Sequence, residues 1–143
     1  MAGSKSNAHE TKVLNYWLGK SFASTAPASV FIRLHNSTVN DAITAATDQL
    51  AGTAANYAQS TLTNSSDSWT NSTDGGSKTN KVTITFTTSA STGWGTVQSF
   101  SISATNSTTT GDIIYWGDLT APQAISAGNV VRFSTGAIVI SED

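Results

Sequence analysis

Cysteine is absent from this chain of 143 residues, and charged residues are scarce. Without cysteine there can be no disulfide, no thiolate zinc site and no cysteine nucleophile, and folding needs no oxidising compartment. Charged residues make up 11% of the chain, and the seven basic ones are scattered and outnumbered by nine acidic ones. Because nucleic-acid binding depends on clustered positive charge, we expect no nucleic-acid partner.

Long apolar runs are also missing from the sequence. No stretch approaches the roughly 20 consecutive apolar residues of a membrane-spanning helix. The segment from residue 1 to residue 14 contains no apolar run that could form the core of a secretory signal. The sequence therefore predicts no membrane association, and we expect a protein that is made soluble in the cytoplasm.

Leucine is rare, whereas small hydroxyl residues dominate. The chain has 6 Leu against 21 Ser and 23 Thr, and Thr, Val and Ile together supply 40 β-branched residues. Such residues favour strands over helices. The length suits one domain, but Val, Ile, Leu and Phe together number only 28, so the core is small. A domain with a small core gains stability by oligomerising or by binding a larger partner.

The apolar pattern is that of an antiparallel β protein. Short β-branched and aromatic runs are separated by Gly, Asn, Asp and Pro about every ten residues, as in sandwiches and barrels. We predict a mainly β fold, an antiparallel, jelly-roll-like β-sandwich with one short N-terminal amphipathic helix. The strands are expected at residues 29–35, 57–62, 81–87, 98–104, 112–117, 123–126, 130–134 and 137–140.

Alternation within these strands predicts which side chains face the core. On the strand at 81–87, Val82, Ile84 and Phe86 are expected to point inward. On the strand at 98–104, Phe100 and Ile102 are expected inward, and the intervening serines, Ser99, Ser101 and Ser103, outward. Residues 127–129, Ala-Gly-Asn, are expected to form a hairpin turn.

One helix is predicted near the N-terminus. Asn7 is the expected N-cap, with Glu10 three residues later in a capping-box arrangement, and Gly19 is the expected end. The apolar residues Val13, Leu14, Trp17 and Leu18 recur at helical spacing and form one face. A helix of about 12 residues is marginal alone, so this face must pack on its own sheet or on another chain. These four residues are candidate partner-binding residues.

The domain organisation is expected to be simple. Residues 1–6 are small and polar and are expected to form a flexible N-terminal arm, and residues 7–143 to form a single β-sandwich domain. Two polar stretches, residues 36–55 and 63–79, are expected to be long loops, which in a compact domain are usually functional or mobile.

Few residues are available for catalysis or metal binding. His35, Ser37 and Asp41 can be written as a triad, but hydroxyl groups are so abundant that one near any histidine is expected by chance. No nucleophile elbow or oxyanion loop accompanies them. The aspartates never show the spacing of a calcium loop. We therefore predict a protein that is not an enzyme and has no catalytic residues, no metal and no cofactor.

The tryptophans raise the question of a binding surface. Trp94 and Trp116 lie within predicted strands or beside them, where packing in the core is the expected role. Trp69 lies in a stretch of Ser, Thr, Asn and Asp, so burial against its own sheet and contact with a partner are both open. Trp69 is therefore a further candidate partner-binding residue.

The order of motifs along the chain resembles that of known proteins. It comprises an amphipathic helix, a Pro-led apolar strand, a Tyr-Ala pair, Asn before a Thr-rich strand, Trp-Gly-Thr-Val, an aromatic strand ending in Leu-Thr-Ala-Pro, and Ala-Gly-Asn before an apolar-Arg-Phe strand. These motifs occupy residues 13–19, 27–34, 57–58, 80–86, 94–97, 113–122 and 127–133. The series resembles a family of small bacteriophage virion proteins described as tail-fibre-like or minor structural proteins, over about residues 11–140.

The resemblance implies a β-sandwich with a structural role in a virion. We favour a capsid decoration, or cement, protein that docks on the head lattice, with the major capsid protein as its partner, because the domain is small and its loops are long and polar. The first alternative is a tail or fibre-tip component that contacts the host, with tail proteins as partners. The second is a carbohydrate-binding module that uses Trp69. On a particle we expect the chain to form homo-oligomers.

Overall fold

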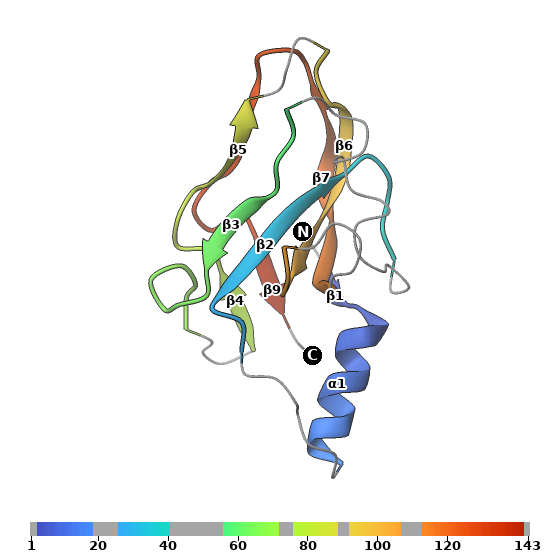
Figure 1. Ribbon diagram of the computed structural model, residues 1–143, viewed down its shortest axis with the longest axis vertical. Helices are drawn as coiled ribbons and strands as arrows, with labels where there is room; N and C mark the ends of the chain where they lie inside the picture. Colours follow the sequence, from blue (N-terminus) through green and yellow to red (C-terminus); the bar gives the residue numbers. More distant parts are fainter. Residues whose placement is uncertain are drawn as a thin grey trace.

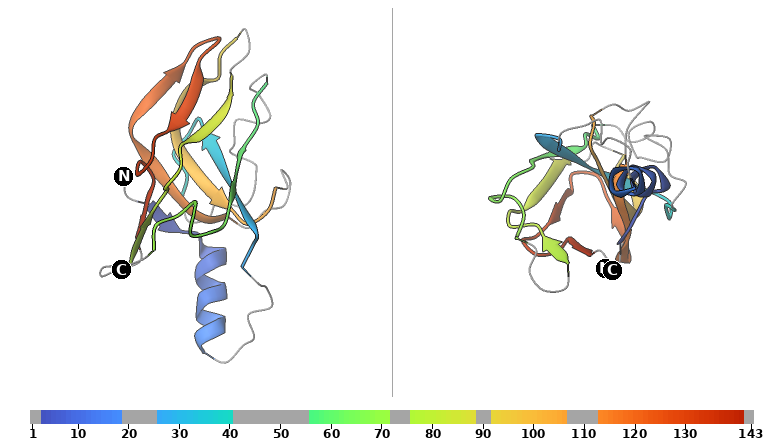
Figure 2. Two further views of the ribbon diagram at one scale, coloured as in Figure 1. Left: turned by 90° about the vertical axis from the view of Figure 1, so that its left-hand side faces the viewer. Right: turned by 90° about the horizontal axis from the view of Figure 1, so that it is seen from below.

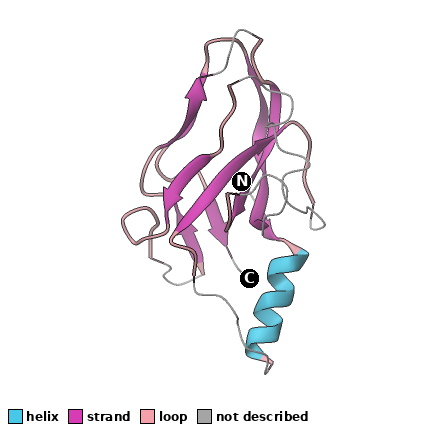
Figure 3. Ribbon diagram, viewed as in Figure 1, coloured by secondary structure: helices cyan, strands magenta, loops and turns pink. Residues whose placement is uncertain are grey.

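A computed structural model describes residues 3–18, 26–40, 56–71, 76–88, 92–106 and 113–141 (Figure 1). Nine strands and one helix lie in these ranges. In chain order they are β1 (Gly3–Lys5), α1 (Asn7–Trp17), β2 (Ser29–His35), β3 (Ser60–Thr63), β4 (Ser77–Thr79), β5 (Ile84–Thr88), β6 (Gly95–Ser103), β7 (Ile113–Ile125), β8 (Val130–Phe133) and β9 (Val139–Ser141). The prediction of a mainly β antiparallel sandwich with one short N-terminal helix is confirmed (Figure 3).

The strands form one large sheet and two strand pairs. The large sheet has the order β1-β7-β6-β2-β3, and the pairs are β4-β9 and β5-β8. All pairings are antiparallel. The two pairs lie opposite one face of the large sheet (Figure 2). The apolar core lies between these layers, where Phe100 of the large sheet meets Phe133 of β8 at a ring distance of 5.7 Å.

Alternation along β2 explains how the core forms. Val30, Ile32 and Leu34 are buried on the inner face, and the register places Ile32 opposite Ile102 and Leu34 opposite Phe100. Such directly opposed apolar pairs stabilise antiparallel sheets. The strand predicted at 29–35 is confirmed with its bounds.

The outer face of the large sheet differs from the prediction. Ser99, Ser101 and Ser103 were expected to face solvent, but all three are fully buried. They lie opposite the polar side of β2, where His35 Nε2 is 2.8 Å from Ser101 Oγ. Ser99 donates to the carbonyl of Ser37 at 2.6 Å. Small hydroxyl groups are tolerated there because hydrogen bonds satisfy them.

Two aromatic residues predicted to pack in the core lie on different faces. Trp94 belongs to the core cluster between the layers, which confirms its prediction. Trp116 is opposite Ser101 in the β6-β7 register and packs instead against a second, smaller cluster of Val39 and Ile113. Val82, predicted to face the core, is exposed because β5 begins only at Ile84.

The C-terminal part of the chain changes layers where a hairpin was predicted. Residues 112–117 and 123–126 were expected to be separate strands, but residues 113–125 form the single strand β7. The turn at residues 127–129 does not close a hairpin, because β8 pairs with β5 in the opposite layer and not with β7. Gly128 has a φ of +78°, which suits glycine at this turn. The turn therefore joins the two layers of the sandwich.

The remaining strands deviate from their predicted bounds. The strand expected at 57–62 is β3 at Ser60–Thr63, and the one expected at 137–140 is β9 at Val139–Ser141. The polar stretch 63–79, expected to be a loop, contributes β4, which pairs with β9. Most of the predicted loop 36–55 lies outside the described residues. Edge strands with weak apolar patterns are thus the ones that the sequence locates least well.

Tyr57 joins the core to the backbone of β2. Its ring stands edge-on to Trp94 at 5.3 Å, and its hydroxyl oxygen accepts a hydrogen bond from the Leu34 N–H at 2.9 Å. Burial raises the pKa of Tyr57 from 10.0 to about 12, although the hydrogen bond from Leu34 and the charge of Arg33 act in the opposite direction.

This shift predicts how stability depends on alkaline pH. The pKa of Tyr57 is higher in the folded state than in the unfolded state. Its contribution to the free energy of unfolding is therefore fully present below pH 10.0 and is lost as pH rises toward about 12. Absorbance titration should show one of the three tyrosines ionising late. Tyr57→Phe should remove this pH dependence and lower the free energy of unfolding by about 1–3 kcal/mol, because the buried Leu34 N–H loses its acceptor. A tyrosine titration unchanged by Tyr57→Phe would contradict the assignment.

Candidate functional site

Helix α1 leaves the sandwich at one end and runs away from it (Figures 1 and 2). Ser6, not the predicted Asn7, is its N-cap, and the Ser6 hydroxyl accepts from the His9 N–H at 3.3 Å. The helix ends with Leu18 as C-cap, one residue before Gly19, which lies outside the described residues. The short helix is thus capped at its N-terminus by a buried serine that belongs to the sandwich.

The segment before the helix anchors it to the large sheet. Residues 3–5 were expected to belong to a flexible arm, but they form β1, which pairs with β7 from Gly3 opposite Gly117 to Lys5 opposite Tyr115. The Ser6 N–H donates to the carbonyl of Ile114 at 3.2 Å, and the Ser6 hydroxyl donates to the carbonyl of Ile113. A polar segment can join a sheet because backbone hydrogen bonds alone supply the pairing. The base of α1 is therefore fixed to the start of β7.

The far half of α1 exposes large apolar side chains. Leu14 is 59% exposed, Trp17 75% and Leu18 80%, and their spacing places them on one side of the helix. Val13 is partly buried. The prediction left open whether this apolar face packs on its own sheet or reaches another chain, and the structure shows that its own sheet leaves most of it uncovered.

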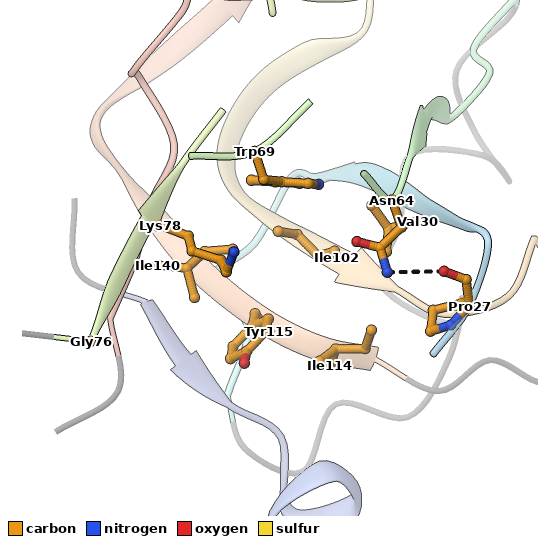
Figure 4. Close-up of a pocket in the computed structure, with 10 residues that line it drawn as sticks. All are labelled: Pro27, Val30, Asn64, Trp69, Gly76, Lys78, Ile102, Ile114, Tyr115 and Ile140. Carbon is orange, nitrogen blue, oxygen red and sulfur yellow. Dashed lines mark hydrogen bonds between the residues drawn. The ribbon is translucent and has the colours of Figure 1, made fainter. Parts of the chain in front are cut away.

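A pocket of about 600 Å³ lies at the same end of the sandwich (Figure 4). Its walls come from the beginnings of β2 and β7, from the region after β3, and from β4, β6 and β9. The lining residues are Pro27, Val30, Asn64, Trp69, Gly76, Lys78, Ile102, Ile114, Tyr115 and Ile140. Most are apolar or aromatic, which is typical of sites that bind apolar groups.

The pocket is directly beside the base of α1. Ile114 and Tyr115 line the pocket, and the same two residues hold the segment that leads into the helix, through the Ser6–Ile114 hydrogen bond and the Lys5–Tyr115 pair. The His9 ring also contacts the Tyr115 ring at 5.5 Å. Pocket and helix base thus share one wall.

Trp69 belongs to the pocket wall. It is 7% exposed, packs in the core cluster and forms an isolated bridge with Asn80. Of the two roles left open for Trp69, burial against its own fold is therefore the one the structure shows, although part of the ring faces the pocket (Figure 4). Lys78, near it on the pocket wall, donates to the carbonyl of Thr70 at 3.0 Å.

The described residues do not assemble a catalytic triad. His35 is buried with its Nε2 2.8 Å from Ser101 Oγ, and Asp41 lies outside the described ranges. Within those ranges no three His, Asp or Glu side chains gather as a metal ion would need. In the part of the chain that the structure describes, no helix has the length and apolar character to cross a membrane.

Sequence reasoning identified the helix face but not the pocket. The pocket residues come from segments as distant as Pro27 and Ile140, and no local motif links them. Their only sequence signal is that several lie at strand ends, which antiparallel pairing brings to one end of the sandwich.

A family of known proteins matches the chain. The model of the family described as podophage GP4 fiber I protein gp80 matches residues 4–141, which is nearly the whole chain. No curated protein matches the chain.

Proposed function

The chain belongs to the podophage GP4 fiber I protein gp80 family, and we propose that it serves in the phage fibre as a non-enzymatic structural subunit that assembles through helix α1. Family membership makes it a virion fibre component with other fibre or tail proteins as partners. This agrees with the predicted fibre alternative. The favoured prediction of a capsid decoration protein bound to the major capsid protein finds no support.

The observation that carries the proposal is the exposed apolar face of α1. Leu14, Trp17 and Leu18 lie on one side of an 11-residue helix that touches its own domain chiefly at the base. Fully burying such a side chain stabilises a complex by about 1.5–3 kcal/mol. Exposed apolar patches on soluble domains commonly mark protein interfaces. The face is therefore suited to bind a neighbouring fibre subunit.

This role predicts a loss of assembly without a loss of folding. Phage that encode Leu14→Ser together with Leu18→Ser should carry much less of this protein per particle, since each loss of about 1.4 kcal/mol of binding energy weakens the affinity about tenfold. Mass spectrometry of purified particles measures the amount. The melting curve of the isolated variant should change little, because both side chains are exposed.

A matched control lies on the same helix. Asn15 is an exposed polar residue of α1, so Asn15→Ser changes one helix position while it leaves Leu14, Trp17 and Leu18 in place. These particles should contain the normal amount of protein. Normal incorporation of the Leu14/Leu18 variant would exclude α1 as the assembly element.

Fibre location can be tested directly because the chain lacks cysteine. Gln123 is exposed near the end of β7, and Gln123→Cys gives a single site for a gold label. Electron microscopy of labelled particles should show gold on fibres at the tail. Gold distributed over the head would contradict the fibre role.

The carbohydrate-binding alternative remains a prediction. Trp69 is mostly buried, and the pocket that it lines is mainly apolar, whereas sugar sites combine an accessible aromatic face with several polar groups. The exposed helix face therefore favours the assembly role over this alternative.

A further inference from the structure

We propose that the pocket binds an aliphatic carboxylate, whose carboxylate group lies at Lys78 and whose apolar tail reaches into the core. This inference goes beyond the proposed function and does not depend on the role of α1. The burial, the charge and the volume of the pocket each support a ligand of this class.

The pocket extends from the surface of the sandwich into its apolar core (Figure 4). Three of its residues, Val30, Trp69 and Ile102, belong to the core cluster and are only 5%, 7% and 2% exposed. Ile140 is half-buried, whereas Lys78 is exposed. The pocket thus has a buried apolar part and a solvated part that carries a charge. A ligand that matches both parts has an apolar tail and a polar head.

The charge of the pocket favours an anionic head. Lys78 is the one charged residue among those that line the pocket, and none of them is acidic. Its ammonium group has three N–H donors, one of which donates to the carbonyl of Thr70 at 3.0 Å. The other two suit a carboxylate, whose oxygens accept charge-assisted hydrogen bonds. We therefore place the head of the ligand at Lys78.

The volume and the walls favour a flexible aliphatic tail. At about 600 Å³ the pocket is within the range of about 300–1,000 Å³ that is typical of sites for small organic ligands. Its aliphatic residues come from four strands, with Val30 on β2, Ile102 on β6, Ile114 on β7 and Ile140 on β9. An unbranched tail can adapt to such an irregular wall because its bonds rotate. Its burial is favourable because apolar surface leaves water.

Hydrogen bonds hold the rim of the pocket in place. On the side opposite Lys78, the Asn64 side-chain amide donates to the carbonyl of Pro27 at 2.9 Å and joins the segment after β3 to the segment before β2 (Figure 4). On the side of β4, the Thr79 N–H donates to the Thr70 hydroxyl at 2.8 Å. A preformed site loses less entropy on binding than one that must be ordered by its ligand. The pocket is therefore already arranged to accept a ligand.

Calorimetric titration of the full-length chain with decanoate tests the apolar part of the site. Decanoate should bind saturably, with one molecule per chain, below the concentration at which it forms micelles. In the series hexanoate, octanoate and decanoate, the affinity should rise about fourfold for each added CH₂ group that is buried. An affinity that stays constant along the series, or no saturable binding of decanoate, would overturn the proposal.

Lys78→Met tests the head group, because methionine keeps an unbranched apolar stem and removes the charge. At low ionic strength the dissociation constant for decanoate should rise about fivefold, whereas that for the uncharged alcohol decanol should not change. Lys81→Met is the matched control. Lys81 is also exposed and donates to the carbonyl of Ser66 at 2.8 Å, but it does not line the pocket. Equal affinities of the two variants for decanoate would contradict the placement of the head at Lys78.

Fluorescence locates the tail. A decanoate with a terminal bromine atom quenches the emission of a tryptophan that the bromine touches, so it should quench part of the emission of the unmodified chain by contact with Trp69. Trp69→Phe should lose this quenching while calorimetry shows that it still binds decanoate. Trp17→Phe, which changes a tryptophan of α1 outside the pocket lining, should retain the quenching. Quenching that persists in Trp69→Phe would place the tail elsewhere and overturn the site.

Discussion

Replacing Trp94 with alanine is expected to lower the free energy of unfolding by about 3–5 kcal/mol. Trp94 is 2% exposed and belongs to the core cluster between the two layers. Its indole packs edge-on against Tyr57, so truncation leaves a cavity and also removes support from the Tyr57–Leu34 hydrogen bond. Whole domains are stable by only about 5–15 kcal/mol. A large fraction of the Trp94→Ala molecules should therefore be unfolded or aggregated near the growth temperature of the host.

Trp17→Ala is the matched control for this prediction. It makes the same chemical change at a side chain that is 75% exposed, so the lost core packing is absent and the urea midpoint of the isolated domain should move little. Urea denaturation of both variants, followed by circular dichroism, measures the contrast. A small effect of Trp94→Ala would mean that the Trp94 ring is not an essential part of the core.

The sequence predicted the elements whose pattern is set by their own residues. The strand at Ser29–His35 was located with its bounds because Pro27 precedes it and apolar and polar residues alternate within it. The helix was located because Val13, Leu14, Trp17 and Leu18 repeat at helical spacing. Trp94 lies between two glycines, Gly93 and Gly95, and both have a positive φ, which glycine adopts most readily. At Gly93 a Cβ would also collide with the carbonyl oxygen of Ile125.

Features that depend on distant partners were not predicted. Ser99, Ser101 and Ser103 look like the exposed side of a strand, and only the placement of β2 beside β6 gives Ser101 a buried histidine as partner. The Ala-Gly-Asn turn at residues 127–129 looks like a hairpin, but β8 pairs with β5. The local sequence determines where the chain forms a turn, whereas the pairing of strands depends on how the two layers pack around the core.

The candidate site likewise has one part that the sequence predicted and one part that it did not. The apolar face of α1 is visible in the sequence as a periodic pattern, and the structure adds that Leu14, Trp17 and Leu18 are largely exposed to solvent. The pocket is assembled from strand ends that are far apart in the chain, so it becomes visible only once the strands are paired. Trp69, interpreted from sequence as a residue of a polar loop, packs in the core cluster and forms a β-bridge with Asn80.

Asn80 is the polar centre of the smaller layer. It is fully buried, and its side-chain amide donates to the carbonyls of Val82 and Ser134 at 2.9 and 2.8 Å. Its side-chain oxygen accepts from the Ile138 N–H at 2.9 Å. One side chain thereby holds the approach to β5, the end of β8 and the approach to β9. Nothing else in the described contacts joins these three segments through a single group.

Asn80→Ala should therefore cost about 1–3 kcal/mol or more, because the buried Ile138 N–H loses its acceptor and the part-buried carbonyls of Val82 and Ser134 lose a donor. Asn80→Asp keeps the size of the side chain but replaces the amide donor with a carboxyl group, so it tests the hydrogen bonds without leaving a cavity. The new carboxyl group keeps the acceptor for Ile138, but in its ionised form it would face the carbonyls of Val82 and Ser134, so burial and repulsion raise its pKa in the folded state.

The sign of the pH effect follows from this shift. In the unfolded variant the introduced carboxyl group releases its proton at about pH 3.9, whereas in the folded variant it retains the proton to higher pH. Asn80→Asp should thus be closest to the unmodified chain near pH 4 and lose stability steadily as pH rises toward neutrality, while Asn80→Ala should be destabilised by a similar amount at both pH values. Urea denaturation near pH 4 and near pH 8 measures both variants against the unmodified chain. An Asn80→Asp variant equally stable at the two pH values would show that the position is open to water, and the role of Asn80 as the centre of this layer would be wrong.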